Sequence, residues 1–232
     1  MKKKKPLQHV NSTRAKKQLE QKQRNEPKTL EAKTYNHKEY IRSIIENDIT
    51  ICTGPAGSGK SFIPAGLFAQ YLMEGRHEQI IATRPLVCSG KDIGSLPGEM
   101  SDKIAPYLKP IEENFKYFLG FSNYGQFLND KKIRYEPLEV MRGATFNNSL
   151  MILDEAQNCT VDQIKMFITR MGKDSKIVIN GDIKQTDISN HNGLDIVINK
   201  LRNIEGLGIC TLTYEDIQRN GIIGKVLKAL EE

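Results

Sequence analysis

The chain has 232 residues, of which 38% are hydrophobic and 27% are charged, and its net charge is +6. This length suits one α/β domain, and it is too short for two full nucleotide-binding domains. No apolar run approaches the roughly 20 residues that cross a bilayer, so we expect no membrane-spanning segment.

The first residues, Met1–Pro6, are basic, but polar residues follow them where a secretory signal would need an apolar stretch. The four cysteines are widely scattered, and none has the spacing of a zinc site. We therefore expect reduced thiols and a cytoplasmic location.

Positive charge is concentrated in residues 1–33, which hold eleven Lys or Arg against three Glu, or +8. Few large apolar residues occur there, so this segment is expected to be a mobile or fraying helical arm. Such an arm could serve solubility, dock an acidic partner or hold the phosphates of a nucleic acid. We assign residues 34–232 to a single domain.

The first part of this domain reads as helix, strand, glycine loop and helix. Apolar residues at helical spacing from Tyr35 precede a short strand at 49–52, and the helix after Lys60 is expected to end near Gly75. A second strand is predicted at 79–83.

The glycine loop fits the pattern G-x-x-x-x-G-K-[ST] in the strand-to-helix context that this motif requires. Its residues are Gly54, Pro55, Ala56, Gly57, Ser58, Gly59, Lys60 and Ser61. Backbone N–H groups of such a loop bind phosphate at a positive helix N-terminus, Lys60 would reach the β- and γ-phosphates, and Ser61 would bind Mg²⁺. The competing interpretation is an ordinary turn, but the strand, loop and helix together favour the motif. We therefore predict a site for a nucleoside triphosphate and Mg²⁺.

Residues 84–148 show no clear rhythm of strands and helices, although 104–118 reads as a broken amphipathic helix. We therefore interpret this stretch as an insertion or lid. Regularity returns with the apolar run 149–153, which is typical of a parallel strand buried on both faces.

Asp154 and Glu155 follow this strand directly. Ligands of open α/β sheets bind at the carboxyl ends of the strands, so Asp154 is a candidate ligand of Mg²⁺ and Glu155 a candidate base for the attacking water. Two acids that merely begin a helix are the plainer alternative.

The remaining elements continue the alternation. Helices are expected at 161–171, 193–202 and 222–230, and strands at 176–180 and 207–214. Gln185 lies just beyond the strand at 176–180, where it could sense the γ-phosphate or belong to a structural turn. The fold class is therefore α/β, a mostly parallel sheet with helices on both faces.

Several segments together resemble the PhoH family of P-loop ATPases, which are similar to the cores of superfamily 1 helicases. They are Gly54–Ser61, Asp154–Asn158, Gly181–Gln185, Thr83–Val87, Leu96–Glu99, Pro106–Pro110, Met141–Phe146 and Lys165–Arg170. The resemblance covers about residues 33–232. It implies a single RecA-like domain that hydrolyses ATP, with nucleic-acid work proposed for the family.

Two positions complicate this resemblance. Asn36-His37 stands where family members tend to have Asn-Gln, so His37 could contact the base or be a surface residue. Arg219, in a stretch similar to a segment of the family, is a candidate for contacting the γ-phosphate, with Arg84, Arg142 and Arg170 as competitors. An arginine of this kind often comes from a neighbouring subunit, which favours a homo-oligomer.

The leading hypothesis is an ATPase coupled to binding or remodelling of nucleic acid, either RNA or single-stranded DNA. A nucleotide-gated assembly switch without motor or helicase activity is the alternative. A small-molecule kinase fits less well, because Asp154 and Glu155 suit activation of water better than transfer to a bound acceptor.

Overall fold

The computed structural model describes residues 24–85, 100–184 and 193–218 and the single residues 222, 226 and 229, with the backbone alone for 100–105. Its centre is a six-stranded sheet in the order β3-β2-β4-β5-β1-β6, in which every neighbouring pair is parallel. The strands are β1 (Ile49–Thr53), β2 (Gln79–Thr83), β3 (Ile133–Tyr135), β4 (Ser149–Leu153), β5 (Lys176–Gly181) and β6 (Leu207–Thr211). The predicted parallel α/β sheet is confirmed.

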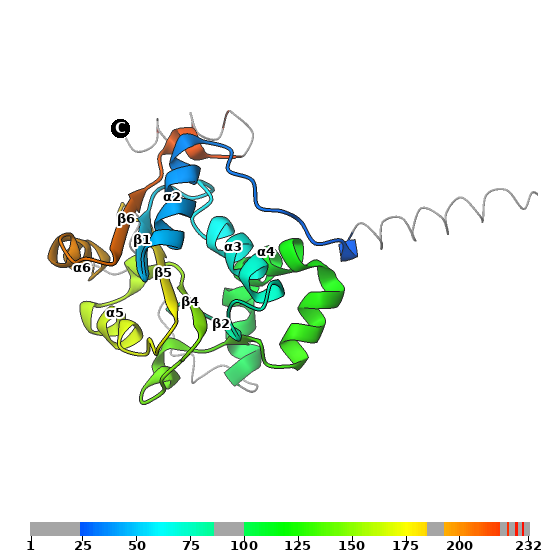
Figure 1. Cartoon of the computed structure of the whole chain (residues 1–232). Coiled ribbons are helices and arrows are strands. Elements are labelled where there is room, and N and C mark those ends of the chain that lie inside the picture. Colours follow the sequence, from blue (N-terminus) through cyan, green and yellow to red (C-terminus); the bar gives the residue numbers. More distant parts are fainter. Residues whose placement is uncertain are drawn as a thin grey trace, which may run out of the picture.

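Helices cover both faces of this sheet (Figure 1). One face packs on α2 (Tyr35–Glu46), α3 (Phe62–Met73) and α4 (Met100–Asn129), and the other on α5 (Val161–Ile168) and α6 (Gly193–Leu201). Alternate residues of each strand enter the two cores, as Ile152 and Met151 of β4 illustrate. All five residues of β4 are buried, which explains its continuous apolar sequence.

The segment expected to be an insertion without regular rhythm contains two elements of the fold. Helix α4 runs from Met100 to Asn129 with a non-helical residue at Gly120, and the edge strand β3 pairs with β2. The predicted broken helix at 104–118 is confirmed as part of α4, which contains Pro106 and Pro110. The expectation of an irregular insertion was wrong for β3, because three residues are too few to show a periodicity.

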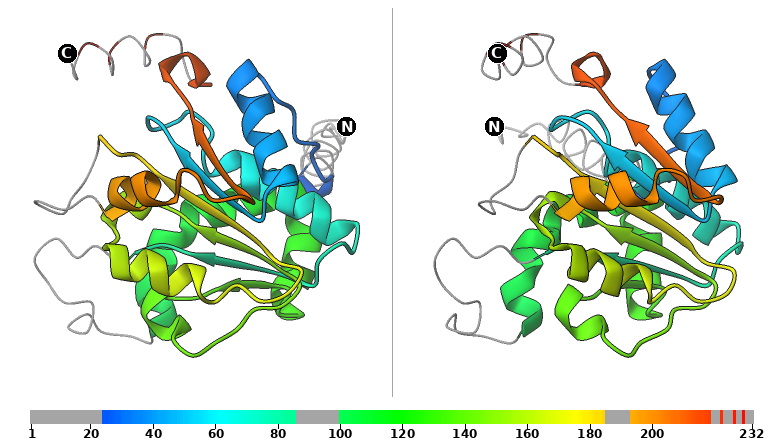
Figure 2. Two further views of the ribbon diagram at one scale, coloured as in Figure 1. Left: turned by 60° about the vertical axis from the view of Figure 1, so that its left-hand side comes forward. Right: turned by 90° about the vertical axis from the view of Figure 1, so that its left-hand side faces the viewer.

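Helix α2 lies next to β6 and the short 3-10 helix η4 (Tyr214–Asp216), although they are far apart in the sequence, as both views of Figure 2 show. Residues 24–33 also contact the domain, since Lys28 N donates to Phe118 O and Leu30 packs on the core. The boundary at residue 33 stays a prediction, and residues 1–23 lie outside the described part.

Within the described residues, no helix is long and apolar enough to cross a membrane. The cysteines that the structure describes, Cys52, Cys159 and Cys210, are free thiols. The predicted closing helix at 222–230 lies largely outside the described residues.

Candidate nucleotide site

The glycine loop joins β1 to α3 and depends on backbone conformations that favour glycine. Gly54, Gly57 and Gly59 have φ values of 152°, 81° and 100°. At Gly54 an added Cβ would lie 2.6 Å from Leu212 O. Leu212, which follows β6, therefore packs directly against the loop. Lys60 Nζ donates to the carbonyl oxygens of Gly54 and Pro55 at 2.6 and 2.9 Å.

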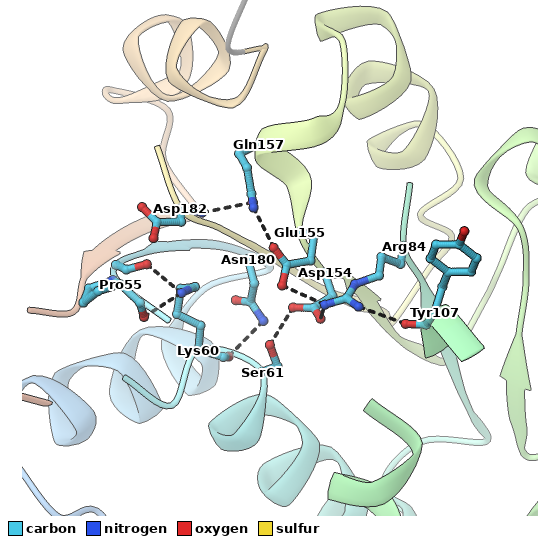
Figure 3. A network of polar contacts seen from close by, with 11 residues as sticks. Pro55, Lys60, Ser61, Arg84, Tyr107, Asp154, Glu155, Gln157, Asn180 and Asp182 are labelled. Atoms are coloured by element: carbon cyan, nitrogen blue, oxygen red, sulfur yellow. Dashed lines mark hydrogen bonds and ion pairs between the residues drawn. The ribbon is translucent and has the colours of Figure 1, made fainter. Parts of the chain in front are cut away.

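The two acids lie next to this loop, at the carboxyl end of β4 (Figure 3). Ser61 Oγ donates to Asp154 Oδ1 at 2.6 Å, which joins the two predicted Mg²⁺ ligands. Burial raises the pKa of Asp154, and Glu155 adds to this effect, while Arg84, Ser61 and Lys60 oppose it. Glu155 has the left-handed conformation (φ 55°, ψ 40°), unusual for a residue other than glycine, asparagine or aspartate.

Arg84 lies against both acids. Its Nη2 is 2.7 Å from Glu155 Oε1 and 3.3 Å from Asp154 Oδ2, and its Nη1 donates to Tyr107 O at 2.9 Å. Arg84 follows β2 just as Asp154 follows β4, and the two strands are neighbours in the sheet. A cation and two anions therefore meet beside the glycine loop.

Two further polar residues, Gln157 and Asn180, form hydrogen bonds to Glu155 and to the backbone of Lys60. Gln157 Nε2 donates to Glu155 Oε2 at 2.6 Å, and Gln157 Oε1 accepts from Asp182 N (Figure 3). Asn180 Nδ2 donates to Lys60 O at 2.9 Å, while Asn180 Oδ1 accepts from Tyr40 OH at 2.6 Å. The start of α3 is thus bonded to β5 and α2.

His37 is buried, with only 3% of its surface exposed, so it is not a surface histidine. Its Nδ1 accepts from Lys33 N at 3.3 Å, and its Nε2 lies 2.9 Å from Ser58 O in the glycine loop. Because a carbonyl can only accept, this arrangement fits a neutral ring with the proton on Nε2. Both ring nitrogens therefore bind backbone atoms, and their geometry supports the loop rather than recognition of a base.

Asp216 binds the start of α2 to η4. Its carboxylate accepts hydrogen bonds from Thr34 Oγ1 at 2.5 Å, from Asn36 Nδ2 at 2.9 Å and from Thr213 N at 2.7 Å. Burial acts to raise the pKa of Asp216, but these hydrogen bonds outweigh it and hold the pKa below 3.8. We call Thr34, Asn36, Thr213 and Asp216 the terminal clasp.

These residues surround a pocket of about 780 Å³, a size that suits a nucleotide. It is lined by loop residues, both acids, Arg84 and His37, and also by Phe62, Pro110, Asn114 and Gln218. The loop supplies N–H groups and a lysine for phosphates, and Ser61 with Asp154 supplies the oxygen donors that Mg²⁺ prefers. The residues present therefore fit a nucleotide with Mg²⁺.

Of the predicted site residues, the structure brings together His37, Gly54–Ser61, Asp154 and Glu155. Gln185 and Arg219 lie outside the described residues. Arg142 is exposed, and Arg170 donates to Ala144 O and Met166 O.

Sequence reasoning missed Tyr40 and Asn180 and left Arg84 as one competitor among several. Asn180 could have been noticed as the one amide within the otherwise apolar run from Ile177. Tyr40 gave no such signal, because its pattern is that of any buried helical residue.

A family model described as "PhoH-like protein" matches residues 29–231. The chain is 38% identical over 204 residues to a PhoH-like protein of Synechocystis, covering 87% of this chain and 62% of that protein. For a PhoH-like protein of Bacillus subtilis the identity is 35% over 207 residues, with coverage of 88% and 65%. The chain thus spans less than two thirds of the length of these relatives.

Among solved structures, the large terminase of a thermophilic bacteriophage in complex with ADP has a similar fold. Its TM-score is 0.52 at 13% identity, covering 84% of this chain and 49% of the terminase. At this identity the similarity supports the α/β fold alone.

Proposed function

Because the chain belongs to the PhoH family, we propose that it hydrolyses ATP with Mg²⁺ and couples hydrolysis to the binding or remodelling of RNA or single-stranded DNA. One observation supports the hydrolysis above all: Lys60 and Ser61 of the glycine loop share a pocket with Asp154 and Glu155. A loop alone indicates nucleotide binding, whereas a loop with two acids at the end of a nearby strand suits phosphoryl transfer to water.

In this proposal Lys60 exchanges the carbonyl oxygens of Gly54 and Pro55 for phosphate oxygens. Ser61 and Asp154 would hold Mg²⁺, which when bound neutralises charge that develops on the phosphates. The buried position of Asp154 suits this role, because a carboxylate that is costly to bury alone gains most from a cation.

Glu155 would accept a proton from the attacking water, and Gln157 orients it through its second carboxylate oxygen. Gln185 as γ-phosphate sensor and Arg219 as an arginine supplied by a neighbouring subunit of a homo-oligomer remain part of the proposal. For His37 we propose that its contact with Ser58 O shapes the loop for phosphate.

The nucleic-acid part rests on charge. Residues 1–23 contain eight Lys or Arg and one Glu, a net +7. A segment of this charge attracts a phosphate backbone without reading its sequence.

The hydrolysis is tested by two variants with opposite profiles. Lys60→Ala is expected to lose tight binding of ATP, whereas Glu155→Gln keeps binding and loses at least about 100-fold in turnover, because it removes only a base. Binding is measured with a fluorescent ATP analogue and turnover by phosphate release. Glu205→Gln, an exposed acid outside the pocket, is the control, and full turnover by Glu155→Gln would refute the assignment.

The coupling is tested by adding single-stranded RNA or DNA to the ATPase assay at low salt. We expect faster turnover, because the hydrolysis rate of an ATPase that is coupled to a nucleic acid changes when that nucleic acid binds. If no strand changes the rate, the coupling is refuted. An oligomer mass that differs between ADP and a non-hydrolysable ATP analogue would then favour the nucleotide-gated switch.

A further inference from the structure

Arg84 is held beside the two acids by the sheet itself. Thr83 and Leu153 are partners in the pairing of β2 with β4, and Asp154 N donates to Thr83 O at 3.0 Å. The residues that follow, Arg84 and Asp154, therefore leave adjacent strands at the same edge. The position of Arg84 in the pocket is set by parallel pairing and needs no second chain.

The guanidinium has fewer partners than donors. Two of its nitrogens reach Asp154, Glu155 and Tyr107 O, whereas the buried Nε has no hydrogen-bond partner among the described residues. The side chain is 19% exposed. A largely buried guanidinium with an unpaired N–H has not used all of its hydrogen-bond donors. It can therefore bind a further anionic ligand.

The proposed reaction needs both acids for other tasks. Asp154 would turn to Mg²⁺ and Glu155 to water, so each must release the guanidinium that it holds at 3.3 or 2.7 Å. Arg84 remains a lining residue of the pocket together with Lys60. Once the acids release it, the planar guanidinium of Arg84 can donate paired hydrogen bonds to phosphate oxygens in the pocket.

We propose that Arg84 is a catalytic arginine that acts in cis, exchanging Asp154 and Glu155 for the γ-phosphate of ATP as the transition state forms. This inference rests on the proposed ATPase function. In the step itself, the water oxygen forms a bond to the γ-phosphorus and gives a proton to Glu155. The bond from that phosphorus to the bridging oxygen breaks, and ADP keeps the electron pair. Arg84 keeps its protons and stabilises charge on the transferred group.

Two features favour Arg84 over the other described candidates. Arg142 is exposed and Arg170 is bonded to backbone carbonyls of its own region, and neither lines the pocket. The consequence is that each chain carries one catalytic arginine for its own site, so the contribution of Arg84 to turnover does not depend on protein concentration, whereas that of Arg219 from a neighbouring subunit would.

The test compares Arg84→Ala, Arg84→Gln and Arg84→Lys with the control Arg76→Ala. Arg76 is an exposed arginine that also pairs with a carboxylate, Glu74, but it lies outside the pocket. For Arg84→Ala we expect kcat to fall about 100-fold or more, with ADP affinity within about threefold of wild type. Tight trapping of ADP by fluoroaluminate, which mimics the transferred phosphoryl group, should be lost. Arg84→Lys should recover only part of the kcat and of the fluoroaluminate trapping, because an ammonium lacks the planar, two-pronged donor arrangement of a guanidinium.

A structural role for Arg84 predicts something else. Losses of ADP affinity and of fluoroaluminate trapping by the same factor, together with a lower melting temperature, would overturn the proposal. So would an Arg84→Ala enzyme with wild-type kcat. Arg84→Gln retains a donor for Tyr107 O and supplies the comparison if the alanine variant does not fold. A wild-type protein that binds ATP without hydrolysing it would instead refute the proposed function, and the inference with it.

Discussion

Tyr40 shows how one buried side chain positions the nucleotide loop. Its hydroxyl donates to Asn180 Oδ1 at 2.6 Å and lies 3.2 Å from Lys60 O, so α2, β5 and the start of α3 meet at a single oxygen. The Tyr40 side chain is fully buried, and burial raises its pKa well above 10.0. The hydroxyl therefore remains a neutral donor across the usual pH range.

We expect Tyr40→Phe to lower the free energy of unfolding by about 1–3 kcal/mol, because Asn180 Oδ1 would lose its donor inside the protein. Urea denaturation at neutral pH measures this change. Tyr117→Phe is the matched control, since the Tyr117 side chain is 52% exposed, and it should change stability by less than about 0.5 kcal/mol. Equal effects of the two substitutions would contradict the role of the Tyr40 hydroxyl.

At this scale the sequence predicted which residues meet but not how they bond. Parallel strands bring their carboxyl ends to one edge, so the meeting of Ser61 with Asp154 could be expected from the motif and the strand order. The pairing of Arg84 with Glu155 could not. It depends on which two strands are adjacent and on the unusual backbone of Glu155, and neither has a signature in local sequence.

At the scale of elements, the packing of α3 on α4 depends on a glycine. An added Cβ on Gly66 would lie 2.7 Å from the ring of Phe118, which is itself buried and packed on Phe62. The helices therefore approach through a position with no side chain, and the approach fixes α4 beside the nucleotide pocket. The sequence placed Gly66 and Phe118 in two predicted helices, but it did not show that these helices meet at this pair.

Gly66→Ala is expected to destabilise the protein by about 1–3 kcal/mol, because the Phe118 ring must move within a packed core. Gly125→Ala provides the control in α4, since nothing lies within 4 Å of an added Cβ there. That substitution should stabilise the protein by about 0.5–1 kcal/mol through helix propensity. Thermal unfolding compares the two, and stabilisation by both would show that α3 and α4 are not in close contact.

The terminal clasp makes stability depend on pH. Asp216 has a pKa below 3.8 in the folded protein, so its contribution is present above that pH and is lost as the pH falls through the lower, folded value. We expect Asp216→Asn to cost about 1–3 kcal/mol near neutral pH, because the charge-assisted hydrogen bonds from Asn36 and Thr213 become weaker neutral ones and an NH₂ group replaces the oxygen that accepts from Thr34.

The cost of Asp216→Asn should shrink as the pH falls below the ordinary pKa of an aspartate and through the lower pKa of Asp216 in the folded protein, where the wild-type carboxylate becomes protonated. Urea denaturation at several pH values follows this difference. Asp130→Asn, at an exposed aspartate, is the control and should change little. A cost that does not vary with pH would refute the carboxylate as its source.

At the scale of the whole molecule, the helical layers and the parallel sheet were predictable because buried parallel strands leave long apolar runs and their crossover helices leave a 3.6-residue period. The order of the strands was not predictable in the same way, since β1 pairs with β5 and β6, which lie far along the chain, as the partners Ile49 and Ile177 show. Long-range pairing of this kind leaves no trace in a local window.

Residues 1–23 carry a net charge of +7, which affects how the whole chain attracts a polyanion. Deleting residues 2–23 should weaken binding to a labelled single-stranded oligonucleotide and flatten the dependence of log K on log salt, because fewer counterions are released. Basal ATP turnover should not change. Residues 24–33 are retained because they contact α4 and the core.

Fluorescence anisotropy at a series of salt concentrations measures the slope. Replacing the exposed Lys165, Lys173 and Lys200 by Gln removes three positive charges near α5 and α6 and serves as the control. An unchanged slope after the deletion would show that residues 2–23 do not contact nucleic acid.

The central position of β1 also bears on the order in which this protein can be made. β1 and the glycine loop are translated early, but their neighbours β5 and β6 end at residues 181 and 211. On the ribosome the loop therefore waits for most of the chain to emerge before a sheet can form around it. We therefore expect nucleotide to stabilise only those chains whose synthesis has passed β6.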